Sequence, residues 1–139
     1  MFLILNKYKI KDEFIFDKQS NLTKLSEDVV KEPGVYLIYK NTGSMKNLVY
    51  IGKAGTFDNK INDFKGQKLK TRIRNTRWNL PGEKSLIKKM KEQNISKLIF
   101  HWYVTVDTNV KHIPLFVESI LLQEYFEEKG KLPPWNKCF

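Results

Sequence analysis

The stretch GVYLIYKNTGSMKNLVYIGKAG, residues 34–55, contains two short segments rich in valine, isoleucine and tyrosine. Residues 34–40 and 47–53 both have the composition of β-strands, which favour β-branched and aromatic side chains. Between them, residues 41–47 are rich in asparagine, glycine and serine, which favour turns. The pattern therefore predicts a β-hairpin with a loop of moderate length.

Each predicted strand carries a tyrosine, Tyr36 in the first and Tyr50 in the second. Side chains alternate along a strand, so a loop symmetric about Gly43 would place the two tyrosines directly opposite each other on one face of the sheet. A cross-strand aromatic pair in the core is the more common role of two such residues, and a chemical role is the alternative. The hairpin alone leaves both interpretations open.

The rest of the chain predicts helices and strands in a single domain. Its 139 residues are a normal length for one compact unit with one core. We expect residues 1–32 to form an N-terminal extension packed on a domain of residues 33–139. The further elements expected are a strand at 13–16, helices at 21–32, 67–78, 83–94 and 113–130, a strand at 97–106 and a loop at 53–66.

The chain is strongly basic, with 25 lysines and arginines against 15 aspartates and glutamates and a formal net charge of +10. Ten of the basic residues and two acids lie between Lys60 and Met90, so this segment carries 10 − 2 = +8. Such a concentration favours a polyanionic partner, either nucleic acid or an acidic membrane surface. A solvated basic face without such a partner is the alternative that charge leaves open.

Cysteine and histidine usage narrow the class further. Cys138 is the only cysteine, so no intrachain disulfide forms, which is typical of a reducing compartment. His101 and His112 are far apart, and no zinc-binding spacing exists. The apolar start is too short for a signal peptide, and no stretch approaches the roughly 20 apolar residues of a membrane helix. We therefore expect a soluble cytoplasmic protein without a membrane partner.

The helix expected at residues 67–78 carries positive charge of two kinds. Leu69 and Ile73 mark its apolar stripe, and Arg72 borders that stripe. From this border an arginine either reaches over the sheet to a phosphate or extends to water. The other basic side chains point further away and are candidates for contacts with DNA phosphates: Lys68, Lys70, Arg74 and Arg77.

Glu118 stands out in the helix expected at residues 113–130. Its neighbours three and four positions away are all apolar: Pro114, Leu115, Leu121 and Leu122. The spacing predicts a carboxylate within the apolar stripe of the helix. Burial of a carboxylate is costly unless it is paired or binds a metal. A salt bridge and a metal site are equally compatible with this position.

Five elements of the chain, in the right order, resemble the motifs of the GIY-YIG endonuclease family. They are Gly34-Val35-Tyr36, Tyr50-Ile51-Gly52 followed by Lys53, an arginine-bearing helix at residues 69–73, a glutamate-bearing helix at residues 118–122, and Pro134-Trp135-Asn136. A three-residue motif is a weak signal alone, whereas five in order are a specific one. The resemblance runs from Pro33 to Asn136.

The chain departs from the family pattern in four places. The loop between the tyrosines and the segment before Arg72 are both longer than usual. Thr76 lies four residues after Arg72, where many members have histidine or tyrosine, which removes one candidate proton carrier or phosphate contact. The spacing from Glu118 to Asn136 is also long, which leaves the outward-facing Glu124 as a second candidate for the metal-binding position.

The resemblance implies an α/β (α+β) fold in which a small three-stranded antiparallel sheet is flanked by helices. The hairpin and residues 97–106 would supply the three strands. It also implies a metal-dependent DNA endonuclease that hydrolyses phosphodiester bonds. In that mechanism Tyr36 is the general base on water, Tyr50 shapes the network or contacts phosphate, and Lys53 favours the phenolate.

The resemblance also implies residues that bind the phosphate, bind the metal and hold the site in position. Arg72 would brace the scissile phosphate. Glu118 would hold one divalent cation, Mg²⁺ or Mn²⁺, through a hard oxygen ligand. Asn136 would order the site from the C-terminal tail.

Two other classes stay open. One is a catalytically silent basic nucleic-acid-binding module, which would need damage at Tyr36, Arg72 or Glu118 that the sequence does not show. The other is a basic interaction or structural domain with coincidental motifs. Within the enzyme class, restriction, phage or mobile-element, and repair roles are all open. Specificity would come from the N-terminal extension, the long loops or a homodimer.

Overall fold

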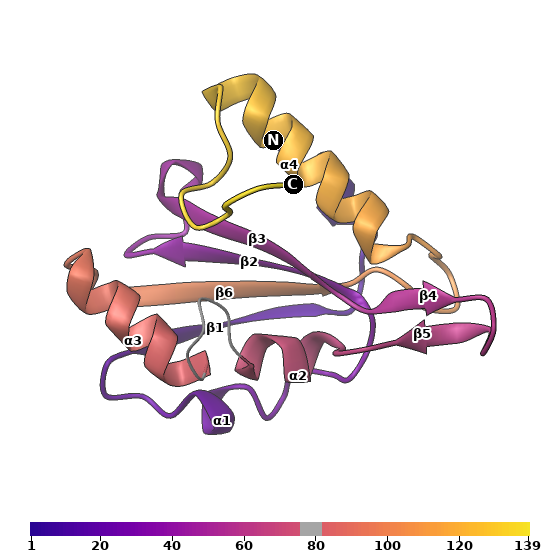
Figure 1. The fold of residues 1–139 in the computed structure, drawn as a ribbon, viewed down its shortest axis with the longest axis horizontal. Coiled ribbons are helices and arrows are strands. Elements are labelled where there is room, and N and C mark those ends of the chain that lie inside the picture. Colours follow the sequence, from indigo (N-terminus) through magenta and orange to yellow (C-terminus); the bar gives the residue numbers. More distant parts are fainter. Residues whose placement is uncertain (76–81) are drawn as a thin grey trace.

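The computed structural model describes residues 1–75 and 82–139 and has a mixed α/β architecture (Figure 1). A four-stranded antiparallel sheet lies at its centre, with the strand order β1-β6-β2-β3. The strands of this sheet are β1 (Lys11–Asp17), β2 (Gly34–Lys40), β3 (Leu48–Ala54) and β6 (Lys97–Val104). A separate two-stranded sheet pairs β4 (Thr56–Asp58) with β5 (Asp63–Lys65).

Helices cover both faces of the main sheet (Figure 1). The described helices are η1 (Leu3–Lys7), α1 (Leu22–Leu25), η2 (Met45–Asn47), α2 (Leu69–Arg74), α3 (Gly82–Glu92) and α4 (Pro114–Lys129). Helices α4 and η1 pack on the face that carries Val35 and Leu37. Helices α1, α2 and α3 pack on the opposite face, which carries Tyr36 and Ile38. Because β2 is buried on both faces, its sequence is nearly continuously apolar.

The main sheet has four strands rather than the three expected, because residues 13–16 belong to β1, which pairs with β6 along its whole length. Side chains alternate between the two faces of β1, and those of Phe14 and Phe16 point into the core. Phe16 is fully buried, and Phe14 stacks on Phe100 with ring centroids 4.7 Å apart. The segment expected as an extension, residues 1–32, therefore contributes a strand to the central sheet.

The helix expected at residues 21–32 is limited to the single turn of α1. Asn21 caps this turn, since its side-chain oxygen accepts a hydrogen bond from the Lys24 backbone N–H at 3.1 Å. Further along, the carbonyls of Val30 and Glu32 accept hydrogen bonds from the first two N–H groups of α2. The chain leaves the helical path here because its backbone caps the start of another helix.

The loop expected at residues 53–66 contains the β4–β5 hairpin, which extends beyond the end of the main sheet (Figure 1). Phe57 lies directly opposite Phe64, and their rings meet edge to face with centroids 5.2 Å apart. A salt bridge of 3.0 Å between Asp58 and Lys65 also joins the two strands. Cross-strand pairs of this kind stabilise a hairpin that is not part of a larger sheet.

The helix expected at residues 67–78 is represented by α2, which ends at Arg74 with Asn75 as its C-cap. Two residues singled out from the sequence, Thr76 and Arg77, lie outside the described residues. The described part of the helix keeps its expected apolar side against the sheet.

The later elements agree with the sequence patterns. Helices α3 and α4 cover the segments expected at 83–94 and 113–130, and β6 lies within the strand expected at 97–106. Pro114 occupies the first turn of α4, and Gly130 follows its end with φ 70°. Across the described residues, no helix combines the length and apolar character needed to span a membrane.

The two tyrosines share a face of the sheet, but they are not directly opposite each other. Tyr36 pairs with Gly52, and Ile38 pairs with Tyr50, so the register predicted from a loop symmetric about Gly43 is wrong. A register irregularity at the end of β2, together with η2 in the loop, moves the turn away from that centre. The rings are diagonal neighbours with centroids 5.9 Å apart.

Candidate active site

The glycine of each motif allows a close approach. A Cβ atom on Gly52 would lie 2.6 Å from Cζ of Tyr36 and 2.8 Å from its hydroxyl oxygen, so the tyrosine lies directly against this backbone. A Cβ atom on Gly34 would overlap the carbonyl oxygen of Tyr103 in β6. Gly52 therefore leaves room for the ring of Tyr36, and Gly34 lets β2 pair closely with β6.

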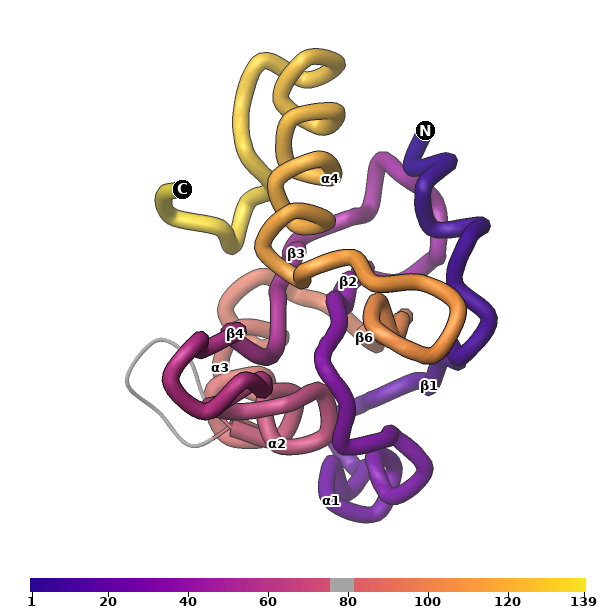
Figure 2. The backbone as a smooth tube through the Cα atoms, turned by 90° about the vertical axis from the view of Figure 1, so that its right-hand side faces the viewer, coloured from indigo at the N-terminus to yellow at the C-terminus, as the bar shows by residue number. Residues whose placement is uncertain are grey.

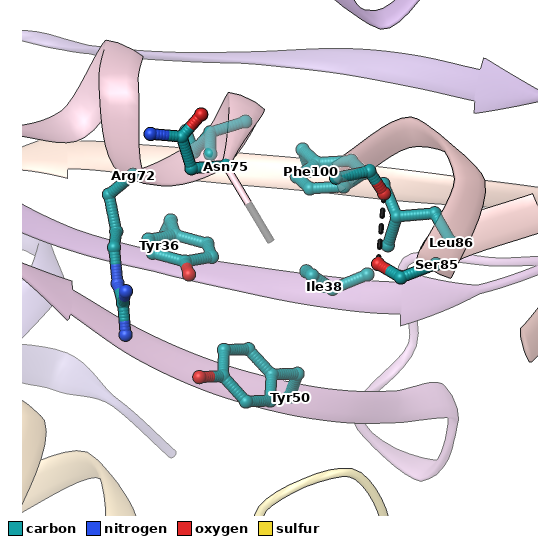
Figure 3. A pocket seen from close by; sticks show the side chains of 10 residues that line it. Tyr36, Ile38, Tyr50, Arg72, Asn75, Ser85, Leu86 and Phe100 are labelled. Carbon is teal, nitrogen blue, oxygen red and sulfur yellow. Dashed lines mark hydrogen bonds between the residues drawn. The ribbon is translucent and has the colours of Figure 1, made fainter. Parts of the chain in front are cut away.

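Both tyrosines line a small cavity together with Arg72. Tyr36 and Tyr50 are only 2% and 7% exposed, and Figure 3 shows the hydroxyl of Tyr50 on the side where the guanidinium lies. The cavity has a volume of about 20 Å³, which is enough for one water molecule. The arrangement brings both tyrosines and Arg72 to one water-sized space, and part of its remaining lining is apolar.

Arg72 reaches this cavity from α2. Leu69 and Ile73 are buried beneath the helix, and Arg72 lies half-exposed at the border of their stripe. Its Nη1 donates a hydrogen bond to Oε1 of Gln67 at 3.4 Å. The side chain extends alongside the two tyrosines (Figure 3), where its charge acts on the same space.

Arg74, two residues further on, holds two helices together. Its Nε donates to Oγ of Ser26 at 2.6 Å, and its Nη2 donates to the carbonyl of Thr23 at 2.7 Å. These bonds tie α2 to the region of α1, so at least part of this charge serves the fold. Two other predicted phosphate contacts, Lys68 and Lys70, are half-exposed on or beside α2. The remaining one, Arg77, lies outside the described residues.

A second cavity, of about 290 Å³, adjoins the first and brings in Lys53 and Glu118. Arg72 lines both cavities. Glu118 comes from α4, on the face of the sheet opposite α2. Because β3 is an edge strand, groups from the two faces meet around that edge. The site thus draws Lys53, Arg72 and Glu118 to one space from three separate elements.

Glu118 lies at the border of the buried face of α4 rather than inside it. Leu121 is fully buried, whereas Leu115 is 51% exposed, so the apolar stripe covers one side of the glutamate only. The carboxylate is half-exposed and lines the second cavity. The alternative candidate, Glu124, accepts a hydrogen bond from the backbone N–H of Phe2 at 2.8 Å, which ties η1 to α4.

The C-terminal segment descends from α4 and covers part of the edge of β3 (Figure 2). The Trp135 N–H donates to the carbonyl of Val49 at 2.8 Å. The Ile51 N–H donates to Oδ1 of Asn136 at 3.0 Å, and Nδ2 of Asn136 donates to the carbonyl of Ile51 at 2.9 Å. The asparagine side chain therefore takes the place of a neighbouring strand at the middle residue of the second motif.

The second cavity offers few ligands for a metal. Its lining contains one carboxylate, from Glu118, and one side-chain amide, from Gln67. Within residues 1–75 and 82–139, no three histidine, cysteine, aspartate or glutamate side chains gather as a cluster. Mg²⁺ commonly uses one or two carboxylates, keeps several waters and takes phosphate oxygens from its substrate. With Lys53 and Arg72 nearby, these residues fit a cation that binds together with a phosphate.

The structure brings two further residues to the site that sequence reasoning did not single out. Gln67 accepts the hydrogen bond of Arg72, and Lys65 lines the second cavity while paired with Asp58. The alternation on both sides of the turn at residues 59–62 is a hairpin signal that would have brought Lys65 into view. Gln67 lies just before α2, and no periodic pattern in the sequence indicates a role for it.

Comparison with known proteins leaves the family open. No family model, curated protein or solved structure matches this chain. The fold and the site define a small α/β domain with a basic cleft at a sheet edge, lined by two tyrosines, an arginine, two lysines and a glutamate. The function has to be inferred from the chemistry of these groups.

Proposed function

We propose that the protein is a metal-dependent DNA endonuclease of the GIY-YIG type. The observation that carries the proposal is the convergence of the tyrosine pair, Lys53, Arg72 and Glu118 on two adjoining cavities. Phosphodiester hydrolysis needs an activated water, neutralised charge at phosphorus and a stabilised leaving oxygen. The net charge of +10 supports a nucleic-acid partner.

Tyr36 is the proposed general base. Together with Tyr50 and Arg72, this residue lines a space of about 20 Å³, which would accommodate the attacking water. As the water oxygen bonds to phosphorus, the phenolate of Tyr36 takes one of its protons, and the bond from phosphorus to the leaving oxygen breaks. The leaving oxygen then gains a proton from solvent. Tyr50, on the other side of this space, orients the water or contacts the phosphate.

A tyrosine base needs cations near its oxygen, because burial alone works against the phenolate. Elsewhere in this protein, burial raises the pKa of Tyr8 to about 12. Burial, and then the nearby Tyr103, also raises the pKa of Tyr39 on the opposite face of β2. The resemblance assigned this role to Lys53, but Lys53 lines the second cavity, whereas Arg72 lines the cavity of the tyrosine pair. We therefore assign the charge that favours the ionised form to the guanidinium of Arg72.

The other site residues act on the phosphate. Arg72 braces the scissile phosphate through its planar fork of donors, and Lys53 adds a second positive charge. Glu118 would hold the divalent cation, Mg²⁺ or Mn²⁺, which when bound supplies charge neutralisation at the phosphoryl oxygens. Asn136 is a positioning residue, since it acts through the backbone of Ile51.

The proposal is tested with supercoiled plasmid DNA. The purified chain should nick or cut the plasmid with Mg²⁺ and leave it intact with EDTA. Glu118→Gln keeps the shape of the side chain and removes its charge, so it should abolish cleavage and preserve DNA binding. Glu128→Gln makes the same change at an exposed position of the same helix and should cut normally. Normal cleavage by Glu118→Gln would refute the metal assignment.

A catalytically silent nucleic-acid-binding module is the second candidate, and the basic charge favours it as much as it favours an enzyme. Binding without cleavage at any concentration of Mg²⁺ or Mn²⁺ would select it.

We place either activity in the cytoplasm, because the single Cys138 allows no intrachain disulfide. Homodimer formation stays a prediction, which sedimentation of the purified protein would test.

A further inference from the structure

A groove leads away from the proposed site along the β4–β5 hairpin. The cavity that contains Glu118 adjoins one of about 440 Å³, since both are lined by Lys53 and Thr56. That cavity in turn adjoins one of about 350 Å³, since both are lined by Phe57 and Ile113. The three cavities therefore follow one another from the proposed site to a space between the hairpin and residues 106–113.

The chemistry of the groove changes along its length. Near the site its walls carry cations, and at the far end they are mostly apolar: Phe57, Phe64, Val106, Lys111 and Ile113. Phe57 is 39% exposed and Ile113 is 51% exposed. Large apolar side chains that gather at the surface beside a charged site are typical of a binding surface.

Both walls of the apolar end are held by local hydrogen bonds and pairs. Phe57 and Phe64 are directly paired across the hairpin. On the other wall, Val106 forms an isolated β-bridge with Lys111. The turn between them is closed by Asp107, whose Oδ1 accepts hydrogen bonds from the next residues of the loop. An aromatic surface fixed in this way is preorganised for a flat ligand.

We propose that the apolar end of the groove binds an unpaired base of the substrate, stacked against Phe57. This inference rests on the proposed nuclease function and names its substrate class: DNA with an unpaired nucleotide next to the scissile phosphate, as in a flap, bulge or single strand. A nucleic-acid strand alternates flat apolar bases with anionic phosphates. The groove offers the complementary sequence, cations at Lys53 and Arg72 followed by an aromatic surface.

Fully paired duplex occupies only the cationic part of this groove and leaves the apolar end empty, because its bases are already stacked and hydrogen-bonded within the helix. An unpaired base presents its faces without that energetic cost. Lys111 at the apolar end adds a positive charge where the next phosphate of an extended strand would pass. The hairpin therefore sets which DNA structure is selected, while the tyrosine site carries out the chemistry.

The experiment uses the full chain in EDTA and two DNAs of identical sequence composition. One carries 2-aminopurine in a single-stranded flap, and the other carries it fully paired. Wild-type protein should bind the flap DNA more tightly and change the fluorescence of its 2-aminopurine. Phe57→Ala should weaken binding of the flap DNA roughly 5- to 100-fold, the range found for loss of one stacking contact. It should leave binding of paired DNA and the salt dependence unchanged.

Three matched variants isolate the ring. Phe57→Tyr keeps an aromatic face and should bind the flap DNA as the wild type does. Phe57→Leu keeps apolar bulk without the π-face and should lose most of the preference. Phe126→Ala removes an equally large, 50% exposed ring from the far part of α4 and should change nothing.

The outcomes separate this inference from the proposed function. If wild-type protein binds and, with Mg²⁺, cuts both DNAs alike, and Phe57→Ala changes neither, the stacking site is refuted while the nuclease stands. If wild-type protein binds neither DNA, both proposals are refuted together. If Phe57→Ala alters only self-association in sedimentation, the groove binds a second copy of the chain and the stacking site is again refuted.

Discussion

Asn136 satisfies both backbone hydrogen-bonding groups of Ile51, accepting from its N–H at 3.0 Å and donating to its carbonyl at 2.9 Å. Since β3 is an edge strand, these two groups would otherwise face solvent or another chain. The contact fixes the backbone between Tyr50, which lines the tyrosine cavity, and Gly52, against which the ring of Tyr36 lies. A side chain distant in sequence thereby holds the candidate site in place.

Asn136→Ala should therefore lower both stability and cleavage rate. Removal of the amide leaves two backbone groups of Ile51 without their partner, which costs roughly 1–3 kcal/mol. Chemical denaturation measures the first effect, and single-turnover cleavage measures the second. Lys137→Ala, at the next and exposed position, is the control and should match the wild type. Equal behaviour of the two variants would mean that the tail does not support the site.

Gly52→Ala should displace the ring of Tyr36. The new methyl group would lie 2.6 Å from Cζ of the tyrosine, which neither group can accommodate without movement. Overpacking of this kind costs roughly 1–3 kcal/mol, and the activity loss should exceed what that destabilisation explains. Gly43→Ala is the matched control, because nothing lies within 4 Å of its new methyl group. Normal activity of Gly52→Ala would argue against a fixed position for the hydroxyl.

Tyr36→Phe removes one oxygen and keeps the buried ring. The melting temperature should stay close to that of the wild type, while the cleavage rate falls by roughly 10²-fold or more through loss of general-base catalysis. Tyr39→Phe makes the same change on the opposite face of β2 and should leave the rate unaltered. If Tyr36→Phe instead unfolds the protein and retains activity when refolded, its role is structural.

Arg72→Ala and Lys70→Ala should give opposite profiles. In the proposed mechanism Arg72 braces the phosphate under attack, so its loss should reduce the rate at saturating protein and weaken binding only modestly. Lys70 is proposed as a long-range phosphate contact, so its loss should lower the salt slope of duplex binding by about 0.9 and change the rate little. A salt titration of binding beside single-turnover cleavage distinguishes them. Identical profiles would reduce Arg72 to one charge among several.

Arg74→Ala should act mainly on stability, in contrast with Lys70→Ala. Its guanidinium donates to Ser26 and Thr23, and loss of such charge-assisted bonds costs roughly 1.5–3 kcal/mol when both are well formed. Because one of these bonds is exposed, we expect the lower end of that range. Urea unfolding of the two variants provides the comparison. A stable Arg74→Ala variant with a reduced salt slope would return Arg74 to the DNA-contacting surface.

Local patterns in the sequence predicted the elements, and long-range pairing decided how they combine. The β-branched and aromatic composition of β2, β3 and β6 was sufficient to place those strands, and Pro114 and Gly130 were sufficient to place the ends of α4. Membership of β1 in the sheet was not, because its partner is β6, at the other end of the chain. The diagonal placement of Tyr36 and Tyr50 depends on a register irregularity that has no sequence signature here.

The same distinction applies to the site. Arg72 and Glu118 were recognisable from their position relative to apolar neighbours on their own helices. That both line one cavity depends on β3 lying at an edge of the sheet, which single-helix patterns do not contain. The structural role of Arg74 was likewise hidden, because its partners Ser26 and Thr23 lie in a distant segment.

The strand order β1-β6-β2-β3 also sets an order of events during folding. The β2–β3 hairpin forms from neighbouring residues, whereas β1 must find β6, the last strand of the main sheet. Contacts between distant segments form late because they close long loops of chain. Helix α4 is the next helix after β6, so we expect its glutamate to dock in these late steps. A partly folded chain would then hold its tyrosines without the glutamate, and the nuclease proposed here would become competent to cut only when folding is nearly complete.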